Sequence, residues 1–86
     1  MDKNCKLSNV TQAYLNTYYT ILNTMIRRMS SVPLSCSSSE TFIGQMIPHH
    51  EGAVRMSNNV LQFNICPELK PILYAIITTN AKALSN

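Results

Sequence analysis

FIGQMIPHHEGAVRMSNNVLQF, residues 42–63, is the stretch that determines the fold, because its apolar residues recur with the period of an α-helix. Residues at alternating steps of four and three form one stripe along the predicted helix, and a second stripe lies beside it. The first consists of Phe42, Met46, His49, Ala53, Met56, Val60 and Phe63, and the second of Ile43, Ile47, His50, Val54, Ser57 and Leu61. A helix with so wide an apolar face is expected to contact two neighbours, as the elements of a helical bundle do.

Pro48 lies inside this helix, where its ring removes one backbone hydrogen bond and presses on the carbonyl of Gly44, four residues earlier. Because glycine lets the backbone yield, we expect a kink that frees this carbonyl beside His49 and His50. A true break of the helix at Pro48 is the alternative, and the sequence leaves both open.

Helical periodicity also marks the segments on either side. The stripe of the first segment consists of Leu15, Tyr18, Leu22, Met25 and Met29. Asn9 with Gln12, and Ser37 with Glu40, have the spacing of helix caps. The chain is therefore expected to be all-α and to form one domain over residues 1–86, with antiparallel helices at about 10–29, 39–63 and 67–84.

The size of the chain favours self-association. A chain of 86 residues buries only about two-thirds of the surface that its unfolded form exposes. With 45% hydrophobic residues there is material for a core, and a second copy would cover what one copy leaves exposed. We expect a homodimer or a higher homo-oligomer.

Charge and hydropathy exclude two classes of partner. The net charge is +3, but the basic residues are scattered instead of lining one face, so no nucleic acid is expected. The longest apolar run, Ile72 to Ile77, is far shorter than the roughly 20 residues of a membrane-spanning helix. Residues 1–7 lack the apolar core of a secretory signal, so we expect a cytoplasmic protein without a membrane span.

The cysteines Cys5, Cys36 and Cys66 are odd in number and show no C-x-x-C spacing, which argues against a disulfide framework and against a structural zinc site. Cys36 and Cys66 flank the same predicted helix, which at 1.5 Å per residue separates them by over about 30 Å. Free thiols are therefore expected.

Methionine and histidine side chains gather in the deciding stretch. Met46 lies three residues before His49 and four before His50, so the side chains can reach a common point. An antiparallel neighbour could bring the thioethers of Met25 and Met29 towards Met46 and His49. Thioether and imidazole together suit copper(I), or silver as its mimic, and do not suit magnesium, calcium or manganese.

Plainer interpretations account for the same residues. Methionine at helical spacing usually fills a core, and an imidazole bonded to the carbonyl freed by Pro48 has a sufficient structural role. No catalytic arrangement is expected: Asp2 is the only aspartate, and the Glu-x-x-His motif of di-iron carboxylate sites does not occur. Met56 lies about 10.5 Å beyond His49 along the helix, too far to share one ion with it.

The deciding stretch resembles the domain of unknown function 305 family. The family signature is met by Phe42-Ile43, by Gln45 to His50, by Gly52-Ala53 and by Met56-Ser57, and the resemblance extends to Tyr19–Met29 and Leu69–Leu84, about 70 residues in all. It implies a ferritin-like helical bundle, often oligomeric, with copper or silver bound by methionine and histidine in some members. In the third helix this chain has Asn80 and Ala83 where the family usually has Gln and Glu.

Two hypotheses for the function follow. In the first, the chain binds a soft metal, with Met46 and His49 as primary ligands and His50 as a ligand or orienting group. The resemblance adds Met56 as a ligand candidate, with the thioethers of Met25 and Met29 behind. In the second, the chain is a structural or protein-interaction module without metal, and the same residues belong to its core. Neither hypothesis makes the chain an enzyme.

Overall fold

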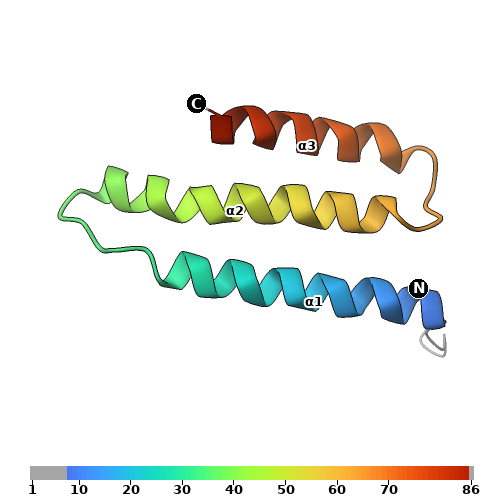
Figure 1. Cartoon of the computed structure of the whole chain (residues 1–86). Helices are drawn as coiled ribbons and strands as arrows, with labels where there is room; N and C mark the ends of the chain where they lie inside the picture. The colour runs from blue at the N-terminus through green and yellow to red at the C-terminus, as the bar shows by residue number, and fades with distance from the viewer. Residues whose placement is uncertain (1–7, 86) are drawn as a thin grey trace.

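The computed structural model describes residues 8–85 and contains three α-helices in chain order, α1 (Asn9–Ser30), α2 (Ser38–Leu61) and α3 (Leu69–Ser85) (Figure 1). No strand occurs in residues 8–85, so the predicted all-helical class with three helices is confirmed. Asp2 and Cys5 lie outside the described residues.

Serine side chains cap the first two helices. Ser8, one residue before the expected Asn9, accepts a hydrogen bond at Oγ from the backbone nitrogen of Thr11, at 3.1 Å. Ser37 caps α2 as predicted, and its Oγ accepts from the backbone nitrogen of Glu40 at 3.3 Å. The Glu40 carboxylate does not complete the capping box, because it accepts from the Ser35 hydroxyl at 2.8 Å.

α2 continues without a break through Pro48, and the proline is buried. Gly44, four residues earlier, has a packing role in addition to the backbone freedom that the sequence indicates. A Cβ atom at Gly44 would lie 2.7 Å from Cγ1 of Val32, in the connection between α1 and α2. A side chain at this position would therefore push the connection away from α2.

The three helices form a single layer with α2 in the middle and its neighbours antiparallel to it (Figure 1). Both α1 and α3 pack on α2, and no Cα atoms of α1 and α3 come within 8 Å of each other in the described part of the chain. The molecule measures 49 × 25 × 19 Å, and its radius of gyration is 15.7 Å. A compact domain of this length would have about 12 Å, so the layer is flat.

A flat layer has little interior. Apart from Pro48, Leu73, at 7% exposed, is the single buried hydrophobic side chain among the described residues, and α1 contributes no buried residue. Polar Ser57 and Asn59 are more deeply buried than Leu73, each at 4% exposed. Asn59 Nδ2 donates a hydrogen bond to the backbone oxygen of Tyr14 at 3.2 Å, which ties α2 to α1. Most large apolar side chains therefore remain partly or fully exposed.

The structure also bears on the cysteines and on the membrane. Cys36 and Cys66 lie in the two connections, and both are exposed free thiols, as predicted. Among the described residues, no helix has the combination of length and hydropathy that crossing a bilayer requires.

Candidate metal site

His50 is held by its own helix. Its Nδ1 lies 2.7 Å from the backbone oxygen of Met46, one turn earlier. Since a carbonyl oxygen only accepts, Nδ1 is the nitrogen that donates, and in the corresponding tautomer the lone pair lies on Nε2. The partner differs from the carbonyl expected from the sequence, because Pro48 frees the oxygen of Gly44. A histidine bonded in this way is oriented for metal binding through Nε2.

His50 and Met46 line an open hollow of about 260 Å³ between the first half of α2 and the end of α3. Its lining residues are Phe42, Ile43, Met46, Ile47, His50, Ala83 and Leu84. All of them except His50 have apolar side chains, so the thioether of Met46 and the imidazole of His50 are the metal-binding groups of this hollow. The signal in the sequence was the stripe through Ile43, Ile47 and His50, but the contribution of Ala83 and Leu84 was missed.

His49 does not join this hollow. Successive residues on a helix point about 100° apart, and the His49 and His50 rings lie with their centroids 6.0 Å apart and their planes at 66°. His49 is exposed, whereas His50 is half-buried. The structure therefore pairs Met46 with His50 and places His49 on another face of α2.

The methionines of α1 lie on the opposite side of α2 from α3. Met25 packs directly over Gly52, where an added Cβ would overlap its side chain, and it lines a small crevice with Pro48. Met29 is half-buried one turn further along α1. Since α1 and α3 flank α2 on opposite sides, Met25 is separated from the Met46–His50 hollow by α2 itself (Figure 1).

Met56 is half-buried in the second half of α2, and it lines neither the Met46–His50 hollow nor the crevice beside Met25 and Pro48. The six candidate ligands are thus dispersed, and Met46 and His50 are the two that share a hollow. Within residues 8–85, no three histidine, cysteine, aspartate or glutamate side chains are grouped so that they could hold a metal ion. A metal site here would depend on thioether sulfur, which is the donor that soft ions prefer.

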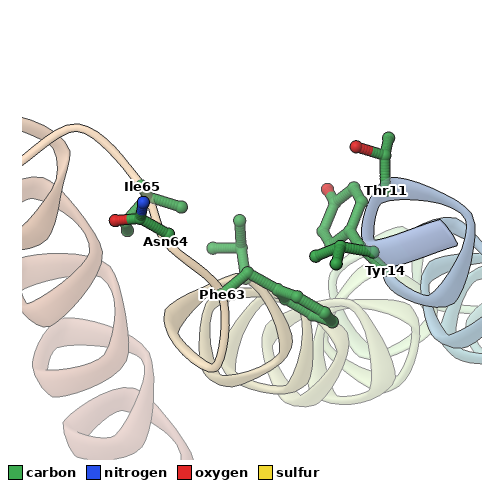
Figure 2. A pocket seen from close by; sticks show the side chains of 7 residues that line it. Thr11, Tyr14, Phe63, Asn64 and Ile65 are labelled. Atoms are coloured by element: carbon green, nitrogen blue, oxygen red, sulfur yellow. The ribbon is translucent and has the colours of Figure 1, made fainter. Parts of the chain in front are cut away.

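A second hollow, between the start of α1 and the end of α2, lacks metal-binding side chains (Figure 2). It measures about 210 Å³, and Tyr14 packs edge-on against Phe63 in its wall, with ring centroids 5.8 Å apart. Its remaining lining residues are Val10, Thr11, Val60, Asn64 and Ile65. With no histidine, cysteine or methionine, this hollow does not fit a soft metal.

An ion pair that the sequence analysis missed aligns α1 with α2. The two terminal guanidinium nitrogens of Arg28, Nη1 and Nη2, donate to the carboxylate of Glu51, at 2.7 and 3.0 Å. This hydrogen bond, more than the charge alone, lowers the pKa of the Glu51 carboxyl below its ordinary value of 4.5. The side chains are 40% and 27% exposed, so the pair contributes little to the free energy of unfolding. Its main effect is to set the alignment of α1 against α2.

The lowered pKa of Glu51 predicts a pH dependence of stability. A carboxyl whose pKa is lower in the folded chain stabilises the fold above its unfolded pKa, and that contribution is lost as the pH falls through the folded value. The free energy of unfolding should therefore decrease on acidification below about pH 4.5. Denaturant titrations at several pH values should show a shallower decrease for Glu51→Gln and for Arg28→Gln. An identical slope in the wild type and both variants would contradict the assignment.

These observations define a class: a small all-helical protein whose three helices form one layer, with an apolar hollow that presents one thioether and one imidazole. The sequence model of the family described as "Domain of unknown function (DUF305)" matches residues 21–86. The match covers most of the chain, including Met46 and His50, and the chain belongs to this family. No curated protein and no solved structure matches it.

Proposed function

We propose that this chain is a cytoplasmic, homo-oligomeric protein of ferritin-like layout that binds copper(I) or silver(I) and catalyses no reaction. Met46 and His50 carry the binding in this proposal. Met25, Met29, His49 and Met56 lie outside their hollow and are secondary candidates. No nucleic acid and no membrane take part.

The hydrogen bond from His50 Nδ1 to the Met46 oxygen is the observation that supports this proposal most. It selects the tautomer whose Nε2 lone pair is free, which is the form that a metal ion requires. Met46 places a thioether in the same hollow. The walls of the hollow are apolar, and a soft monovalent ion with sulfur and imidazole ligands tolerates such surroundings better than a hard divalent ion does.

The alternative function is a structural or protein-interaction module without metal. The same hydrogen bond supports it, because a half-buried imidazole bonded to a backbone oxygen already has a sufficient structural role. The alternative and the metal-binding proposal differ in what happens when copper(I) is added.

The test is an anaerobic titration with copper(I) against a competing chromophoric chelator. All cysteine thiols are first alkylated, since free thiols bind the ion regardless of any other site. The wild type should compete for the ion. His50→Leu and Met46→Leu should each bind at least about tenfold more weakly, because removing a ligand costs no less than removing an outer-shell partner.

His49→Leu is the matched control, since it removes the neighbouring imidazole but leaves the hollow intact. It should bind as the wild type does. If the alkylated wild type does not compete, the metal-binding proposal fails and the interaction module remains. Loss of binding in His49→Leu with full binding in His50→Leu would move the site to the exposed histidine and overturn the assignment of ligands.

A further inference from the structure

The layer has two broad faces, and the Arg28–Glu51 ion pair marks one of them. Arg28 on α1 and Glu51 on α2 meet across the seam between the two helices. Arg55 lies one turn beyond Glu51 and lines the same crevice. This side of the layer, defined by Arg28, Glu51 and Arg55, is called the charged face below.

Helical geometry shows which α1 residues lie on the opposite face. Met25 points at α2, and Arg28 points to the charged face. At 100° per residue, one stripe of α1 points well away from Arg28. The stripe consists of Leu15, Tyr19, Leu22, Ile26 and Met29.

The same argument applies to α2. Gly52 and Asn59 face α1, and Glu51 points to the charged face. The residues nearly half a turn away from Glu51 belong to the stripe with which the helix was first recognised. They are Phe42, Met46, His49, Ala53, Met56 and Val60. The two stripes together are called the uncharged face.

The uncharged face is apolar and uncovered. Neither stripe contains Lys, Arg, Asp or Glu. Three of its large side chains are more than half exposed: Tyr19 at 53%, Ile26 at 53% and Phe42 at 58%. Large apolar side chains exposed on one side of a single layer of helices are typical of an interaction surface.

The dimensions fit a partner of the same size. The whole layer, with α3 included, extends 49 by 25 Å, so one complete side has a projected area of about 1,200 Å², above the roughly 800 Å² per partner of a standard stable interface. The chain exposes 6608 Å², against about 5,100 Å² for a compact protein of 9.7 kDa. Stacking two such layers would supply the interior that one layer lacks.

We propose that a second copy of this chain docks on the uncharged face and forms a two-layer dimer of six helices. An apolar stripe without charges is complementary to itself, as a two-fold symmetric interface requires. The charged faces then lie outside, in water. The inference takes only the oligomeric state from the proposed function, and it names the face that the oligomer uses.

Two tyrosines of similar exposure provide a matched test. Tyr19 lies on the uncharged face and is 53% exposed, and Tyr74 lies on α3, outside both stripes, and is 57% exposed. Light scattering after size-exclusion chromatography of the metal-free protein should give the mass of two chains for the wild type and for Tyr74→Glu. Tyr19→Glu and Ile26→Glu should each raise the dissociation constant by at least about 30-fold, because each buries an unpaired charge in the interface.

A wild type that stays monomeric at about 100 µM, far above the dissociation constant of an ordinary stable dimer, would overturn the proposal. So would equal dissociation of Tyr74→Glu and Tyr19→Glu. If Tyr19→Glu loses its helix content, dilution of the wild type decides: the amide resonances of Ile26 and Met56 should shift, and that of Tyr74 should not. The reverse pattern would place the interface elsewhere. A dimer that binds no copper(I) refutes the metal-binding proposal alone.

Discussion

Replacing Leu73 with alanine should lower the free energy of unfolding by about 2–5 kcal/mol, the range for Leu→Ala in a protein core. Leu73 is 7% exposed and is, apart from Pro48, the single buried hydrophobic residue of the described chain. It lies on α3 and faces α2, so its truncation removes the best-packed contact between these helices. For a chain with so thin an interior, this loss is a large share of the total stability.

Leu34 provides a control with the same chemical change. It lies in the connection between α1 and α2 and is 88% exposed, so Leu34→Ala should change the stability by less than about 0.5 kcal/mol. Urea unfolding followed by circular dichroism measures both variants. Equal effects of the two substitutions would mean that α3 is not held to α2 through Leu73.

Gly52→Val is expected to cost about 2–3 kcal/mol by overpacking the α1–α2 seam. A Cβ atom at Gly52 would overlap the side chain of Met25, including its sulfur. Valine would force Met25 out of its position or push α1 away from α2. The gain that a residue other than glycine brings inside a helix, about 0.5–1 kcal/mol, is too small to offset this.

A double-mutant cycle identifies the cause. In a Met25→Ala background the space over Gly52 is open, so Gly52→Val should cost at least about 1 kcal/mol less there than in the wild type. Asn58→Val, on the exposed side of the same helix, controls for the β-branched side chain itself. Strict additivity of Met25→Ala and Gly52→Val would show that the two positions are not in contact.

The helices were predictable because their signals are local. The four-three stripes of residues 42–63 and the Ser37 cap lie within one helix and depend only on residues a turn apart. The start of α1 was displaced by one residue, since Ser8 and Asn9 are both good cap residues and their order of preference is weak. From the sequence, Pro48 allowed either a kink or a break of the helix. In the structure α2 is continuous, and the packing of Gly44 and Pro48 favours this.

The arrangement of the candidate ligands was only partly predictable. Met46 and His50 are one turn apart, and this local spacing brought them into one hollow. The separation of His49 from His50 also follows from helix geometry alone. The position of Met25 does not follow from helix geometry, because it depends on the register of α1 along α2. The Arg28–Glu51 ion pair and the contact of Met25 with Gly52 set this register, and both join residues far apart in the sequence.

The most direct test of the proposed site is a long-range ¹H–¹⁵N spectrum of the histidine rings, recorded with the cysteines alkylated and silver(I) added in steps. Before addition, His50 should show the tautomer protonated at Nδ1. With one equivalent of silver(I), the Nε2 resonance of His50 should shift, and so should the methyl resonance of Met46 in a ¹H–¹³C spectrum of the same sample, while His49 stays unchanged. Unchanged His50 and Met46 resonances, or a shift confined to His49, would contradict the proposed site.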